Sequence, residues 1–283
     1  CSALYFTVGG RGTESALYRI VYRGDESTDP VPPEFGSDVS VTAASRDVRH
    51  KIEAFHGHAD PNALKVAWPY LDSSDRFLRF AARIAIENQP VDSWRQRALD
   101  ETRPQALVTA MVALARQGSA ADLPALLARL GTLDWDALDE SVQLGALRAC
   151  SLAFIRLGLP EGELRDAAIE ALEPLYPAKS GALNAELVPL LVALNSPDVV
   201  AKGIAFMKAE QTTALPPWAD LIERNDGYGG PIAKMLANMP PLEDIQVALS
   251  LRTATAGWTL PLRREYFSFF PVAAQHPGGA SYS

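Results

Sequence analysis

The spacing of apolar residues changes near residue 43, and this change constrains the possible folds more than any other feature of the chain. Upstream of residue 25 apolar residues alternate with their neighbours, which is typical of a β-strand, whereas downstream they recur every three to four positions, which is typical of an amphipathic helix. Prolines stand where helices should begin and glycines where they should end. The pattern predicts a mainly α protein with short, separately capped helices at about 75–87, 105–117, 120–131, 141–157, 161–175, 184–194 and 197–208.

Two strands are expected at the N-terminus. Leu4, Phe6 and Val8 form an alternating pattern, a second alternating pattern follows at 18–22, and a glycine-rich segment separates the two. Glycine accommodates the positive φ angles of tight turns, so this arrangement favours a β hairpin. A hairpin of two strands is only marginally stable on its own in water. We therefore interpret residues 1–24 as a partial β hairpin that ends a larger β domain.

The next segment separates the hairpin from the helical region. Residues 25–42 are acidic and contain Pro30, Pro32 and Pro33, which restrict φ and remove backbone donors that a sheet would need. We expect this segment to be a linker, and we expect residues 43–283 to form one helical repeat domain.

Composition argues against several classes of protein. The chain has 26 basic and 34 acidic residues, a net charge of −8, which is the wrong sign for a protein that binds the phosphates of nucleic acid. Its apolar stretches are shorter than the roughly 18 residues of a membrane-spanning helix. Its two cysteines, Cys1 and Cys150, form neither a CxxC motif nor a haem attachment site. We expect no nucleic-acid partner, no membrane span and no cofactor in this segment, and sequence motifs identify no catalytic residue.

Three segments share a weak internal repeat. They begin at Asp75, Gln143 and Asp198, and each has a polar cap, then a basic residue four or five positions on, then a small residue three positions further. This spacing resembles the second helix of HEAT and related helical repeats. The resemblance implies a degenerate HEAT-like α-α superhelix, an array of antiparallel helix pairs from about residue 43 to 270, preceded by a short N-terminal β hairpin.

A second resemblance extends over nearly the whole chain. Residues 4–13 and 17–19 look like the closing blade of the β-propellers of secreted bacterial sugar-dehydrogenase-like proteins. Residues 52–57, 68–71 and 75–83 are similar to segments of the helical-repeat region that follows the propeller in these multidomain proteins. A c-type cytochrome domain often lies further on in that family. The resemblance therefore implies a periplasmic or secreted location and a middle segment whose flanking domains carry the redox chemistry.

The absence of catalytic motifs and the resemblance together favour a non-catalytic scaffold or docking module of a larger exported redox protein. Its partner would be another protein or the neighbouring domains of the same polypeptide. An enzyme is the competing class: either a quinone- or haem-dependent sugar dehydrogenase whose catalytic parts flank this segment, or an unrecognised carbohydrate-active helical domain. The latter alternative depends on carboxylates beside tryptophans at 134–140 and 218–223.

A third class is a self-associating structural protein. The end of a helical array exposes an apolar face, and such a face can bind a second copy of the chain. The contact would then involve the C-terminal aromatic residues Tyr266, Phe267, Phe269 and Phe270.

Three histidines are weak candidates for metal ligands. His50, His56 and His58 fall within nine residues, and imidazole is a common ligand of transition metals. His50 and His56 would point to different sides of a helix, because six residues correspond to about 240° of rotation. The alternative is that His56 packs against or caps the end of a helix, where the helix dipole favours a protonated imidazole.

The helix expected at 75–87 has two distinct faces. Phe77 and Leu78 belong to a broad apolar face that we expect to pack in the core, whereas Arg76, Arg79 and Arg83 recur at three- and four-residue spacing and form a basic ladder.

The basic ladder is a candidate for a partner-binding surface, together with Trp94 and Arg95 on the next segment. An anionic partner could dock there, and charge reversal at Arg79 and Arg83 would then weaken binding. The alternative is that these guanidinium groups pair with acidic residues of neighbouring helices or stay solvated.

Overall fold

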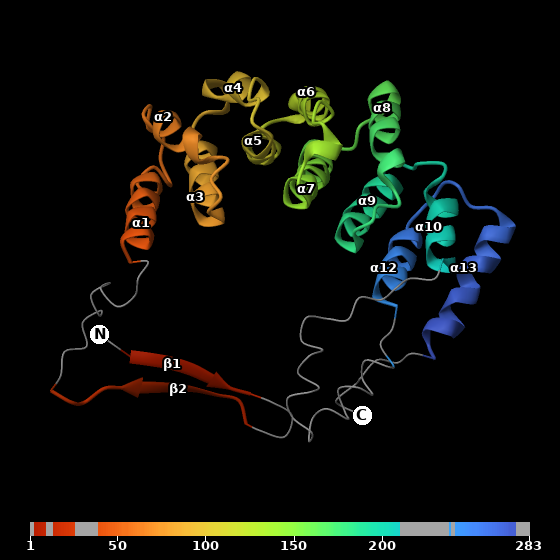
Figure 1. Ribbon diagram of the computed structural model, residues 1–283, viewed down its shortest axis with the longest axis horizontal. Helices are drawn as coiled ribbons and strands as arrows, with labels where there is room; N and C mark the ends of the chain where they lie inside the picture. Colours follow the sequence, from red (N-terminus) through yellow and green to blue (C-terminus); the bar gives the residue numbers. More distant parts are fainter. Residues whose placement is uncertain (1–2, 10–13, 26–38, 210–237, 239–240, 276–283) are drawn as a thin grey trace. The chain divides into compact units, whose positions relative to one another are not determined.

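The structure is a computed structural model, and it describes residues 3–9, 14–25, 39–209, 238 and 241–275 (Figure 1). Within these residues twelve α-helices accompany one antiparallel pair of strands, which confirms the expected mainly α class with a short N-terminal β hairpin. The chain divides into two compact units, Cys1–His50 and Lys51–Ser283. Most of the expected linker, residues 26–38, lies outside the described residues.

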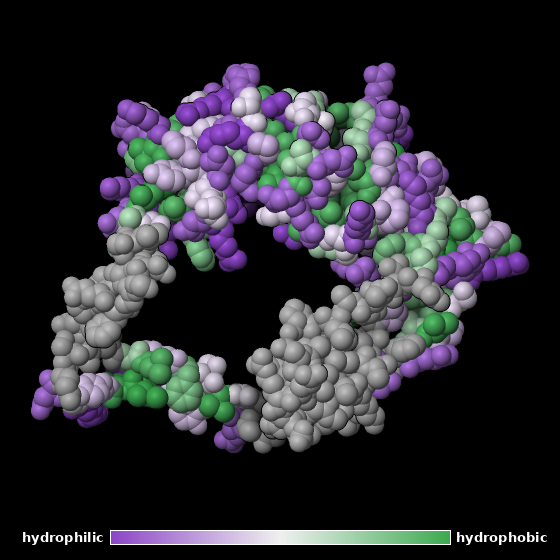
Figure 2. Space-filling view, viewed as in Figure 1, coloured by the Kyte–Doolittle hydropathy of each residue, from purple (hydrophilic) through white to green (hydrophobic). Residues whose placement is uncertain are grey.

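The first unit contains the β hairpin. β1 (Ala3–Val8) pairs with β2 (Ala16–Val21) so that Leu4 faces Ile20 and Phe6 faces Tyr18. The rings of Phe6 and Tyr18 stack across the strands at 5.2 Å between centroids, a contact that stabilises the pair. Leu4 nevertheless leaves 63% of its surface exposed, and hydrophobic residues line the visible face of the hairpin (Figure 2). Within the described residues of this unit the hairpin is thus largely uncovered.

The second unit consists of helix pairs joined by loops and 3₁₀ turns. α1 (Val39–Glu53) crosses the boundary between the units. Further along the chain, each short first helix packs against the longer helix that follows it. The pairs are α2 (Ala63–Ala67) with α3 (Arg76–Glu87), α4 (Arg95–Leu99) with α5 (Pro104–Gln117), α6 (Leu123–Leu130) with α7 (Glu140–Leu157), and α8 (Gly162–Leu172) with α9 (Gly181–Ala193).

The second helices of the pairs form a continuous row. α3 contacts α5, α5 contacts α7, and α7 contacts α9, as the neighbouring ribbons in Figure 1 also show. Each pair therefore buries its apolar face against the next pair, which is the packing of a helical-repeat-like fold. The row continues from α9 to α12 (Leu242–Leu251), while α10 (Val199–Lys208) packs against α12 and α13 (Leu260–Ala273). The 3₁₀ turns are η1 (Trp68–Tyr70), η2 (Val91–Ser93), η3 (Ala120–Asp122), η4 (Trp135–Ala137) and η5 (Glu173–Leu175).

The centre of the unit lies between α5 and α7. Met111 and Leu114 on α5 and Leu147 on α7 are almost completely buried. The two helices approach closely at Gly145, where an added Cβ atom would lie 2.9 Å from Cγ1 of Val108. Since real Cβ contacts are not that short, the absence of a side chain at Gly145 permits this approach.

The seven expected helices agree with the observed bounds to within three residues, whereas α1, α2, α4, α12 and α13 are not among the expected ranges. α9 begins at Gly181, three residues earlier than the sequence pattern indicates. The Asn184 side chain accepts a hydrogen bond from Ala178 N at 2.7 Å and donates one to Ala178 O at 3.0 Å. These bonds hold the loop against the first turn of α9, where Leu183 is already buried.

The N-cap of α7 provides a test of local helix stability. Asp139 accepts a hydrogen bond from Val142 N at 3.0 Å, whereas Asp198, the N-cap of α10, makes no such bond. Asp139→Ala is expected to lower the free energy of unfolding by about 1 kcal/mol. Asp198→Ala, the matched control, is expected to change it by less than about 0.5 kcal/mol. Urea unfolding followed by circular dichroism measures both, and equal effects would contradict the assignment.

Candidate docking surface

One side of α3 carries two exposed phenylalanines beside two guanidinium groups, of which Arg76 is exposed and the Arg83 side chain is only 14% exposed. We call Arg76, Phe77, Phe80 and Arg83 the α3 ridge. Phe77 and Phe80 each leave 57% of their surface exposed. The guanidinium of Arg76 lies 4.9 Å from the centre of the Phe77 ring, and that of Arg83 lies 5.1 Å from the centre of the Phe80 ring. These are cation–π contacts, which orient the rings and the charges side by side.

Local sequence explains why the ridge faces away from the core. Asp75 caps α3 by accepting a hydrogen bond from Phe77 N at 2.8 Å, which sets the start and the phase of the helix. Leu78, Ala82 and Ile86 then fall on the opposite side and are buried. Phe77 is a correction to the expected core face, because the apolar arc of this helix is wider than its neighbours cover.

Two arginines of the basic ladder have partners within the helical unit. Arg79 donates hydrogen bonds to the carbonyl oxygens of Ser73 and Ser74 in the preceding loop. Arg83 pairs with Glu87, which also pairs with Arg116 of α5 at 2.9 Å. Arg83 therefore pairs with an acidic residue of its own helix rather than of a neighbouring one, while no carboxylate among the described residues pairs with Arg79.

The other two candidates for partner binding, Trp94 and Arg95, lie outside the α3 ridge. Trp94 is fully buried, and its Nε1 donates a hydrogen bond to Gln89 O at 3.2 Å. Arg95 pairs with Asp92 and with Asp122, the latter at 2.6 Å. Trp94 is thus a core residue in spite of its basic neighbours, because the start of α4 turns its side chain inward, and neither residue joins the α3 ridge.

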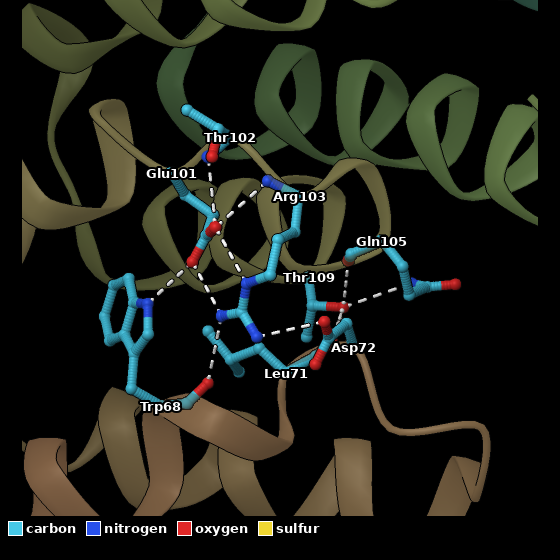
Figure 3. Close-up of polar contacts among 8 residues, drawn as sticks. All are labelled: Trp68, Leu71, Asp72, Glu101, Thr102, Arg103, Gln105 and Thr109. Carbon is cyan, nitrogen blue, oxygen red and sulfur yellow. Dashed lines mark hydrogen bonds and ion pairs between the residues drawn. The ribbon is translucent and has the colours of Figure 1, made fainter. Parts of the chain in front are cut away.

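A buried carboxylate joins the first two helix pairs (Figure 3). The Glu101 side chain is 8% exposed and lies where α4 leads into α5. It accepts a hydrogen bond from Trp68 Nε1 at 2.8 Å, and its two oxygens pair with Arg103 at 3.0 and 2.9 Å. Arg103 also pairs with Asp72 at 2.9 Å. The cluster ties η1 and the loop before α3 to the start of α5.

The electrostatics of this cluster are those of a structural ion pair. Hydrogen bonds from the Arg103 side chain, opposed by burial, lower the pKa of Glu101 to about 2, and the bond from Trp68 adds to the lowering. Glu101 is therefore ionised at neutral pH. Sequence reasoning missed this cluster, since Trp68 and Glu101 are 33 positions apart and only the fold brings them together.

The histidines make local hydrogen bonds. His56 Nε2 lies 2.9 Å from Ala81 O, and His58 Nδ1 lies 3.2 Å from His56 O. His50 is exposed on α1. In the part of the chain that the structure describes, no three His, Cys, Asp or Glu side chains gather as a metal site would require. His56 thus packs against α3 through a backbone carbonyl.

The remaining candidates are divided between the core and the surface. Trp135 is half-buried and Asp136 is exposed, while residues 218–223 lie outside the described residues. Tyr266 is buried and donates a hydrogen bond to Ala248 O at 2.9 Å, whereas Phe267 and Phe270 are exposed. No helix in the described ranges is both long and apolar enough to cross a membrane.

Comparison of the chain with family models, with curated proteins and with solved structures gives no match.

Proposed function

We propose that the helical unit is a docking scaffold, and that the α3 ridge binds the surface of another domain or protein. The observation that carries the proposal is the exposure of two phenylalanines with guanidinium groups over their rings. Aromatic residues and arginine are the residue types most enriched at the energetic centres of protein interfaces.

The charge of the ridge indicates the chemistry of its partner. Arg76 of the ridge forms no ion pair among the described residues, and Arg79 beside it bonds there only to carbonyl oxygens, so no carboxylate offsets either charge. The whole chain, in contrast, carries a net charge of −8. A complementary partner presents carboxylates beside an apolar side chain, because carboxylates match the guanidiniums and an apolar group covers the rings.

The exposure of the hairpin supports the proposal that a larger β structure covers it. Its apolar side chains are exposed, and each strand has one edge without a hydrogen-bonded neighbour in the described residues. Such an uncovered two-stranded hairpin gains stability by pairing with or packing on a further sheet. We propose on this basis, and on the resemblance, that the chain is a segment of a larger exported redox protein and is not itself catalytic.

Site-specific crosslinking tests the docking surface. A photo-crosslinking phenylalanine analogue replaces Phe77 in the polypeptide as its gene encodes it, and the same analogue replaces Ile155, which is exposed on α7, as the matched control. We expect a crosslink from position 77 to one defined acidic segment, identified by mass spectrometry, and none to that segment from position 155. Crosslinks that are equal at both positions, or absent at position 77, would contradict the proposal.

Substitutions on the ridge are expected to weaken binding without disturbing the fold. Phe80→Ala and Arg76→Glu each lower the yield of the position-77 crosslink at least about tenfold, since each removes a central contact. Phe267→Ala, a truncation of an equally exposed phenylalanine on α13, leaves the yield unchanged. Loss of the crosslink with Phe267→Ala alone would instead favour the self-associating alternative.

The redox context has a separate test. We expect the natural polypeptide to be heavier than 30.6 kDa and to show the absorbance of reduced c-type haem. A colourless polypeptide of 30.6 kDa would refute the redox context and leave the docking surface to be judged by crosslinking. Oxidation of a sugar with a redox dye by residues 1–283 alone would refute the non-catalytic assignment.

A further inference from the structure

An apolar cavity of about 330 Å³ lies between α6, α7 and α8. Its walls include Leu130 of α6, Cys150 and Phe154 of α7, and Ala168 and Leu172 of α8. Hydrophobic atoms are visible between α6 and α8 in Figure 2. The pocket is partly open to solvent, and its lining is made almost entirely of apolar side chains.

The residue types on α8 explain why the space is not filled. Ala167, Ala168 and Ala171 face the cavity, whereas the corresponding first helix of the preceding pair, α6, buries leucines. α8 packs mainly against η5 and α9, and Leu172 is its one buried residue. Small side chains on α8 therefore leave a gap where larger ones would close the contact with α6 and α7.

The lining favours uncharged ligands. Among the residues that the structure describes, no charged side chain contributes to the wall. Burial raises the pKa of the Cys150 thiol to about 12, so the thiol is neutral at physiological pH. Trp135 supplies an aromatic wall, and its carbonyl oxygen accepts a hydrogen bond from Gln143 Nε2 at 2.9 Å, which fixes the turn that carries the ring.

We propose that this cavity binds a neutral, apolar small molecule, such as a hydrocarbon chain or an aromatic ring system. Small-molecule sites are pockets lined mainly by apolar and aromatic side chains, and this volume lies at the lower end of their range. Two of the α8 alanines, Ala167 and Ala171, are exposed, so the cavity has access to solvent along α8. This binding site is independent of the α3 ridge and of the function proposed for it.

The test uses N-phenyl-1-naphthylamine, a neutral apolar dye whose fluorescence increases in apolar surroundings. We expect saturable binding of one equivalent by the wild-type chain and a rise in its melting temperature with dye concentration. Ala168→Leu fills the cavity and is expected to weaken binding at least about tenfold while raising the melting temperature of the free protein by about 2–4 °C. Ala125→Leu, the same substitution at an exposed position of α6 outside the cavity, should bind the dye as the wild type does.

Other results would overturn the proposal. Wild-type chain that shows no saturable binding, or Ala168→Leu that binds as tightly as wild type, excludes this cavity as the site. If Ala168→Leu disturbs folding, the binding measurement is repeated with Ala171→Leu. Ala171 lines the same wall but is exposed, so a leucine there is less disruptive to the fold. Binding by Ala171→Leu that equals that of wild type would then refute the proposal, and binding weakened at least about tenfold would support it.

Discussion

Glu101→Gln is expected to lower the free energy of unfolding by about 3 kcal/mol at pH 7, because it removes the charge of a buried carboxylate that pairs with Arg103. The glutamine amide also presents donors to a site that already contains donors from Trp68 and from the backbone N–H groups of Thr102 and Arg103. Arg103 keeps Asp72 as a second partner, so the loss lies at the lower end for a buried pair. Urea unfolding measures the difference.

The same residue makes stability depend on acid. The folded-state pKa of Glu101 is about 2, below its ordinary value of 4.5, so its contribution is present above pH 4.5 and is lost as pH falls toward 2. At about 1.4 kcal/mol per pKa unit, the contribution amounts to about 3 kcal/mol. The difference between wild type and Glu101→Gln should therefore shrink steadily below pH 4.5.

Glu163→Gln is the matched control for this prediction. Glu163 is exposed in the first turn of α8, and its substitution is expected to change the free energy of unfolding by less than about 0.5 kcal/mol at any pH. A loss of less than about 1 kcal/mol for Glu101→Gln at pH 7, or a loss that does not vary with pH, would show that the cluster does not hold the first two helix pairs together.

Asp244→Asn is expected to act in the opposite direction and to stabilise the protein at pH 7.5 by about 1–3 kcal/mol. Asp244 is buried in the first turn of α12, and its Oδ1 has no hydrogen-bond partner within the described ranges of the chain. Burial, together with the negative charge of Glu243, raises the pKa of Asp244 to about 6. Above this pH the chain must keep an ionised carboxylate in an apolar place.

The direction of this pH dependence follows from the raised pKa of Asp244. The unfolded-state value is 3.8, so the stability gained by protonating Asp244 is fully present below about pH 4 and is lost as pH rises through 6. Asparagine is neutral throughout, and the advantage of Asp244→Asn should therefore disappear near pH 4. This pH range lies above the one in which Glu101 titrates, so the two effects are separable.

Hydrogen exchange of the α12 amides, compared at pH 4.5 and pH 7.5, measures the effect locally. We expect the wild-type amides to be better protected at pH 4.5, after correction for the intrinsic exchange rate, and those of Asp244→Asn to be equally protected at both. Glu243→Gln, a change of the exposed neighbour, should retain most of the wild-type pH dependence. Equal pH dependence in Asp244→Asn and wild type would contradict the prediction.

The sequence by itself determined the fold class, the hairpin and seven of the twelve described helices. Period-two alternation around Phe6 and Tyr18 predicted the hairpin, and the three-to-four-residue period with proline starts predicted the helices, because both signals arise from residues that are close in the chain. Asp75 and its helix show this well: the cap, the start and the buried positions at Leu78, Ala82 and Ile86 all follow from local pattern. Helix caps, helix starts and the buried face of a helix depend on backbone geometry, which residues close in the sequence determine.

Only the tertiary structure decided which residues are available for function. Periodicity does not show which distant segment, if any, will cover a given aromatic side chain. Phe77 is exposed and Trp94 is fully buried, because other segments cover Trp94 and leave Phe77 uncovered. The pairing of Glu101 with Trp68 and the cavity beside Ala168 likewise depend on how successive helix pairs stack. Burial, ion pairing and cavity volume are properties of contacts between distant segments, and a local pattern contains no information on which segments will meet.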